Sequence, residues 1–80
     1  MQTSSGSVVK VIELVGNSPN SFSDAVRNAV KTASRTIRNI SGVDVISSSA
    51  EVGADGELTN YKVNVKIAFV IESSEAASAG

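Results

Sequence analysis

The stretch FSDAVRNAVKTASRTIRNI, residues 22–40, carries the clearest structural signal in the sequence. Its apolar side chains recur at intervals of three and four residues, which is the spacing of one stripe on an amphipathic helix. The stripe consists of Phe22, Ala25, Val26, Ala29, Val30, Ala33, Ile37 and Ile40. Ser21 is a suitable N-cap, and Asp24 stands where a capping box places its acidic member. Ser41-Gly42 is suited to end the helix, with Gly42 in a left-handed conformation.

On both sides of this helix the sequence is typical of β-strands. The predicted strands are residues 8–15, 43–52 and 58–71. In the last of them, apolar residues alternate with Lys62, Asn64 and Lys66, which indicates one apolar face. Residues 16–20 (GNSPN) predict a loop, and residues 53–56 (GADG) predict a hairpin turn. The expected fold class is therefore α+β, with the order β-α-β-β and a three-stranded antiparallel sheet on one helix. The position of the first strand, beside the second or the third, stays open.

The chain is short, with 80 residues and neither Cys nor His. A core of this size is near the lower limit of independent stability, and disulfides are excluded, so self-association is the expected remedy. Thiolate and imidazole metal sites are excluded as well. No Ser-His or Cys-His pair can form, so we expect a protein that is not an enzyme.

The formal net charge of −1 argues against nucleic acid as a main partner. Residues 1–7 lack the charged and apolar regions of a signal peptide, and no apolar run approaches the length of a membrane span. We therefore expect a cytoplasmic protein without a membrane partner. The Ser/Ala-rich composition predicts disordered tails at residues 1–7 and 73–80, around one domain at residues 8–72.

A single helix can cover only one face of the predicted sheet. The last strand has the apolar residues Ala68 and Val70 on its other face. In residues 8–15, apolar side chains occupy both even and odd positions and therefore both faces of the strand. Uncovered apolar strand surface indicates an interface, although a wet face with scattered valines is the alternative.

Three further patterns could bind ligands, and the ordinary structural role is favoured for each. The basic row Arg27, Lys31, Arg35 and Arg38 could bind phosphate or an acidic partner, or form the solvated side of the helix. Residues 16–20 and the following helix N-terminus offer a generic anion site or a plain cap. The carboxylates could be oxygen ligands of a cation such as calcium, within one chain or shared between subunits, but they form no EF-hand pattern. They are Glu13, Asp44, Glu51, Asp55, Glu57 and Glu72.

Residues 9–19 (VKVIELVGNSP) closely resemble the opening strand and loop of the dodecin family. Phe22, the run Asn28-Ala29-Val30, residues 36–40 and residues 61–69 continue the resemblance, which covers residues 8–72. It implies a β-α-β-β subunit whose strands curl around the helix, assembled as a hollow homododecamer of cubic-type symmetry. Typical dodecins bind riboflavin or FMN in stacked pairs near two-fold axes, as storage proteins without turnover.

The flavin site is where this sequence departs from the family. Dodecins that bind flavin usually place a Trp just after the helix, where this chain has Gly42, followed by Val43. A Gln that usually contacts the flavin is here Lys62, while Glu51 matches an acidic position of some members. Loss of a stacking platform costs roughly 1–3 kcal/mol. The resemblance thus leaves two hypotheses. One is a shell that has lost or altered flavin binding and binds cations, as some relatives without the Trp are thought to do, or another small ligand. The other is a flavin store with a remodelled pocket.

Overall fold

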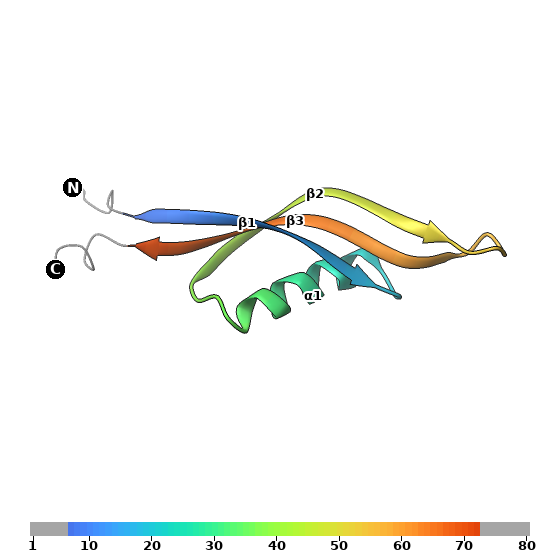
Figure 1. Cartoon of the computed structure of the whole chain (residues 1–80), viewed down its shortest axis with the longest axis horizontal. Helices are drawn as coiled ribbons and strands as arrows, with labels where there is room; N and C mark the ends of the chain where they lie inside the picture. The colour runs from blue at the N-terminus through green and yellow to red at the C-terminus, as the bar shows by residue number, and fades with distance from the viewer. Residues whose placement is uncertain (1–6, 73–80) are drawn as a thin grey trace.

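The computed structural model describes residues 7–72, which form one helix packed on one face of a three-stranded sheet (Figure 1). The elements are β1 (Val8–Ser18), α1 (Phe22–Ser34), β2 (Ile40–Val52) and β3 (Leu58–Glu72). All pairings are antiparallel, and the strand order β1-β3-β2 places β3 in the middle. The predicted α+β fold is confirmed, and the first strand pairs with the third. The predicted disordered tails lie outside the described residues, apart from Ser7.

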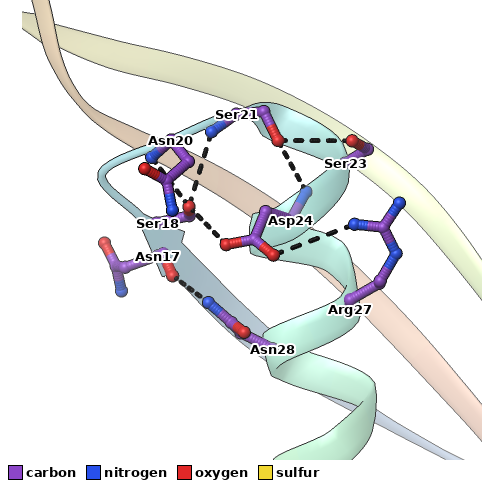
Figure 2. A network of polar contacts seen from close by, with 8 residues as sticks. All are labelled: Asn17, Ser18, Asn20, Ser21, Ser23, Asp24, Arg27 and Asn28. Atoms are coloured by element: carbon purple, nitrogen blue, oxygen red, sulfur yellow. Dashed lines mark hydrogen bonds and ion pairs between the residues drawn. The ribbon is translucent and has the colours of Figure 1, made fainter.

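Helix α1 begins where predicted because Ser21 caps it (Figure 2). Ser21 Oγ accepts a hydrogen bond from the Asp24 amide at 3.0 Å, a contact that typically contributes about 1 kcal/mol. The Asp24 carboxylate accepts a hydrogen bond from Ser18 Oγ at 2.8 Å. Ser18 Oγ in turn accepts from the amides of Asn20 at 2.9 Å and Ser21 at 3.4 Å. The buried Ser18 hydroxyl therefore joins the end of β1 to the first turn of α1.

The helix ends at Ser34, so the prediction of a helix as far as Ile40 is wrong. Asn39 adopts the left-handed conformation expected of Gly42, with φ of 63°, and Gly42 lies within β2 instead. Ile37 and Ile40 nevertheless pack against the core, from the connection and from β2. Their spacing suits a helix, but a turn followed by a strand brings the same side chains to the core.

Strand β1 continues to Ser18, so the loop predicted for residues 16–20 is wrong for Gly16, Asn17 and Ser18. Gly16 pairs with Val63 and lies directly against α1. A Cβ at Gly16 would overlap the Ala25 carbonyl oxygen and lie 3.1 Å from the Ala29 Cβ. Glycine is required here because the strand and the helix backbone approach too closely for any side chain.

The predicted hairpin turn between β2 and β3 is confirmed. The Gly56 amide donates to the Gly53 carbonyl at 2.9 Å, and the Gly53 amide donates to the Glu57 carbonyl at 2.8 Å. Gly56 has a positive φ of 86°, and Asp55 Oδ1 accepts from the Glu57 amide at 3.0 Å. The pattern is that of a type I turn followed by a left-handed glycine.

The core lies between α1 and the middle strand. Ala25, Ala29 and Ala33 of the helix are buried, and their small side chains let α1 lie close to the sheet. The buried residues opposite them are Val63, Val65 and Ile67 of β3. Full burial of a Val or Ile side chain contributes about 1.5–3 kcal/mol. Most of the subunit's internal stability is therefore expected at this seam.

Much of the sheet lies outside this seam, and Figure 1 shows both of its ends extending beyond α1. The chain measures 60 × 21 × 14 Å, and nearly every residue of β2 is exposed. The exposed large apolar residues are Val8, Val9, Val11, Val15, Phe22, Val43, Val45, Ile46, Val52, Leu58 and Ile71. Within residues 7–72, no helix has the length and apolar character needed to cross a membrane.

Candidate functional site

The residues that the resemblance places in a ligand site fall into two separate groups. Gly42 and Val43 lie near the start of β2, whereas Glu51 lies near its end beside Lys62 of β3. Gly42 pairs with Ala68, and Lys62 pairs with Ser49. The β3 residues 62 and 68 are separated by about 20 Å, at roughly 3.3 Å per strand residue. One chain therefore cannot bring all four residues to one small ligand, and their assignment to a shared site stays a prediction.

The two neighbours Gly42 and Val43 point to opposite faces of the sheet. We call the face that packs on α1 the inner face and the opposite one the outer face. Val43 pairs with the buried Ile67 and belongs to the inner face, although it is itself 40 % exposed. Gly42 pairs with Ala68 and belongs to the outer face.

Gly42 leaves open space on the outer face. A Cβ at this position would meet no atom within 4 Å, and the φ of Gly42 is not in the left-handed region. Neither packing nor backbone conformation therefore requires glycine here, in contrast to Gly16. A side chain could therefore begin at this position without a clash at its Cβ, and this chain has no Trp anywhere in its sequence.

Glu51 and Lys62 form the best-defined polar contact on the outer face. Lys62 Nζ lies 2.8 Å from Glu51 Oε2, and both side chains are partly exposed. The hydrogen bond from Lys62, and then its charge, lower the pKa of Glu51 below its usual value of 4.5. A hydrogen bond to Asn60 acts in the same direction. The Lys62 ammonium group is thus held by a carboxylate of its own chain.

Two asparagines near this ion pair were not singled out in the sequence. Asn60 Nδ2 donates to Asn17 Oδ1 at 3.4 Å, and Asn17 pairs with Lys62. Farther along the outer face, Asn64 has a buried Oδ1 without a hydrogen-bond partner among the described residues. The polar alternation of the last strand marked Asn64, but its burial depends on the neighbouring strands. Asn17 was predicted to lie in a loop, so its place in the sheet could not be anticipated.

The generic anion site, which the sequence offered as the less favoured alternative to a plain cap at the start of α1, is occupied largely by the protein's own groups. The amides of Asn20, Ser21 and Asp24 bond to serine hydroxyls, and the Ala25 amide donates to the Ser21 carbonyl at 3.1 Å. The Asp24 carboxylate occupies the same region, as Figure 2 shows. The helix start is therefore a structural cap, as favoured from the sequence.

The acidic residues do not gather into a metal centre in the described part of one chain. Within residues 7–72, no three His, Cys, Asp or Glu side chains are placed to hold an ion. On the outer face of the described chain, Glu13 of β1 and Asp44 of β2 are the strand-register partners of Lys66, without forming ion pairs with it.

Known proteins of one family match this chain over nearly all of its described residues. The Dodecin family model matches residues 8–72. Calcium dodecin of Mycobacterium tuberculosis is 30 % identical over 69 residues, covering 86 % of this chain and 96 % of that protein. Its crystal structure, which describes a calcium-chelating antigen with a calcium-binding site, gives a TM-score of 0.71 at 84 % and 94 % coverage.

Other solved dodecins are also similar to this chain, with higher TM-scores. The Streptomyces coelicolor dodecin has a TM-score of 0.78 and 35 % identity, with 85 % of this chain and 96 % of that chain covered. A Trp-to-Phe variant of the Thermus thermophilus dodecin has a TM-score of 0.79 and 30 % identity, with 84 % and 98 % covered. The Thermus protein thus has a natural Trp, whereas this chain has none. By the family match, the identities and the shared fold, the chain belongs to the dodecin family.

Proposed function

We propose that this protein is a non-enzymatic small-ligand-binding shell, a cytoplasmic homododecamer of the dodecin type in which flavin binding is lost or altered. The proposal depends on the residues at two outer-face positions, 42 and 62, where this chain differs from typical flavin binders. Gly42 provides no surface on which a flavin ring could stack, and Lys62 is paired with Glu51.

Assembly is supported by the shape of the subunit. Its radius of gyration is 16.9 Å, whereas a compact domain of this length has about 11 to 12 Å. Apolar residues such as Val9, Val11 and Val45 are about half exposed in one chain. Exposed apolar surface of this kind typically marks an interface, and further copies of the chain are the partners that the family fold offers.

The ligand site is expected to be shared between copies. Gly42 and Lys62 are separated by about 20 Å along the sheet of one chain. A flavin that contacted both positions would therefore bridge two subunits. Without the Trp, such a site lacks stacking worth roughly 1–3 kcal/mol, which weakens binding about tenfold or more. The ammonium group of Lys62 also lacks the acceptor that an amide offers.

A cation is one ligand that the shell could hold instead. The calcium dodecin of Mycobacterium tuberculosis is described as calcium chelating. In this chain the outer-face carboxylates Glu13, Asp44 and Glu51 are exposed, and oxygen ligands of this kind suit hard cations. A calcium site would form where these residues from neighbouring copies approach one another.

The alternative is a flavin store with a remodelled pocket. It is favoured by the open space at Gly42, which would admit a ring that reaches the sheet directly. Riboflavin and FMN remain the candidate cofactors for this alternative. Yellow protein with quenched flavin fluorescence would support it.

The test is a fluorescence titration of the purified assembly with riboflavin and with FMN. We expect no binding up to high micromolar flavin for the natural chain. The variant Gly42→Trp/Lys62→Gln is expected to quench flavin fluorescence at lower flavin concentration. The matched control Gly42→Trp/Lys66→Gln has the new ring and loses a Lys of the same strand and face, so it should bind more weakly. Tight binding by the natural chain, or equal binding by both variants, would contradict the proposal.

A further inference from the structure

The connection between α1 and β2 forms a polar groove that the proposed function does not use. Six consecutive residues, Ser34 to Asn39, line a cavity of about 390 Å³. Arg35, Thr36, Arg38 and Asn39 are among the lining residues, and none of the six is acidic. Donors therefore dominate this groove.

Basic residues at the end of a helix can bond to its last carbonyl groups, but here other donors already do so. Ser34 Oγ donates to the Lys31 carbonyl at 2.8 Å, and the Arg35 amide donates to the Thr32 carbonyl at 3.3 Å. The amides of Thr36 and Ile37 donate to the Ala33 carbonyl at 3.2 and 2.9 Å. The guanidinium groups of Arg35 and Arg38 make no hydrogen bond within the described residues, so their donors remain available.

The charge of the groove is also uncompensated. Among residues 7–72, the ion pairs are Arg27 with Asp24 at 3.8 Å and Lys62 with Glu51 at 2.8 Å, and neither involves the groove. The helix C-terminus contributes roughly half a negative charge. Two guanidinium groups outweigh it, so the groove is electropositive.

The groove is held in a fixed shape by its own backbone. Ile37 lies between the two arginines in sequence and packs against the core. The Asn39 carbonyl accepts a hydrogen bond from the Val70 amide at 3.0 Å, which fastens the connection to β3. Binding a ligand here therefore requires little further ordering of the backbone.

We propose that this groove binds the phosphate group of a small phosphorylated molecule through Arg35 and Arg38. Paired guanidinium groups match the geometry and charge of phosphate oxygens. A cavity of about 390 Å³ is in the range of small-molecule sites, so it has room for an organic group beside the phosphate. The site is distinct from Gly42, which lies on the outer face of the sheet. Phosphate binding in the groove therefore does not depend on whether the protein binds flavin.

The test is calorimetric titration of the full-length assembly at low ionic strength with AMP, with adenosine as the uncharged probe. The natural protein should bind AMP and not adenosine. The variant Arg35→Gln/Arg38→Gln should weaken AMP binding about tenfold or more, because bonds to charged groups are lost. The matched control Arg27→Gln/Lys31→Gln removes the same charge from the neighbouring helix α1, outside the groove, and should change binding less than about twofold. Circular dichroism verifies that both variants fold.

Three results would overturn the proposal. The first is no detectable binding of AMP by the natural protein at millimolar concentration. The second is equal weakening by the groove variant and the control, which would indicate diffuse attraction by the whole basic row. The third is binding of a short single-stranded oligonucleotide far more tightly than AMP, with equal losses in both variants, which would indicate a polyanion surface.

Discussion

The part of the sheet beneath α1 and the parts that extend beyond it have the same strand pattern but different surroundings. Ile67 and Ile71 lie on the same strand and on the same face, yet Ile67 is 0 % exposed and Ile71 is 53 % exposed. The same contrast holds for two glycines. Gly16 touches the helix backbone, whereas nothing lies near Gly42. Helix α1 thus covers only part of the inner face, while the candidate ligand residues Gly42, Glu51 and Lys62 lie on the outer face, which no element of the described chain covers.

The largest difference between the two regions is expected for loss of apolar side chains. Ile67→Ala removes a fully buried side chain and should lower the free energy of unfolding by about 2–5 kcal/mol. Ile71→Ala is the matched control outside the helix-covered region and should cost less than about 1.5 kcal/mol. Urea denaturation measures both. Equal losses would show that other copies bury Ile71 as completely as α1 buries Ile67.

The two glycines allow the same comparison by addition of one methyl group. Gly16→Ala forces a Cβ onto the Ala25 carbonyl and should destabilise the protein by about 1–3 kcal/mol, since backbone must move. Gly42→Ala meets open space and should change stability by less than about 0.5 kcal/mol. Thermal unfolding is the measurement. A larger loss of stability for Gly42→Ala than for Gly16→Ala would contradict the packing described for these two positions.

A smaller effect is expected at the helix start. Ser21→Ala removes the hydroxyl that accepts from the Asp24 amide and should cost about 1 kcal/mol. Ser23→Ala is the control, because Ser23 is exposed on the same turn and its hydroxyl contacts only the Ser21 hydroxyl, at 3.3 Å. Urea midpoints compare the two variants. If Ser23→Ala were the more destabilising change, Ser21 would not be the cap that defines α1.

The smallest effect belongs to the exposed ion pair on the outer face. Lys62 lowers the pKa of Glu51, so the pair stabilises the folded chain above the usual pKa of about 4.5 and this contribution is lost as the pH falls below it. The stability difference between the natural chain and Glu51→Gln should therefore shrink as the pH is lowered from neutral to acidic. Glu57→Gln, in the exposed turn, is the control for loss of one charge. A difference that grows on acidification would contradict the ion pair.

Local signals in the sequence predicted the elements and the start of the helix. They did not predict the end of the helix or the end of β1, which depend on contacts between residues far apart in the sequence. Ser21 and the Gly53–Gly56 turn act through neighbours in sequence and were predicted correctly. The helix end was not, because Ile37 and Ile40 keep helical spacing while packing from outside the helix. The extension of β1 pairs Asn17 with Lys62 and Ser18 with Tyr61 of β3, a long-range pairing that no local pattern reveals.

The candidate site shows the same limit. The resemblance identified Gly42 and Lys62 by position, and the sequence showed that both differ from typical flavin binders. Their separation follows from the register of β2 on β3, which the sequence left undetermined. The pairing of Lys62 with Glu51 is a diagonal contact of that register and became visible only with the strands in place.

The central claim is that one chain leaves its sheet incomplete and that further copies complete it as a shell without a stacked flavin. Native mass spectrometry of the protein as purified, together with its absorbance spectrum, tests this claim most directly. The account predicts a complex with the mass of twelve chains and no flavin absorbance. A monomer in dilute buffer, or a complex that carries flavin, would contradict it.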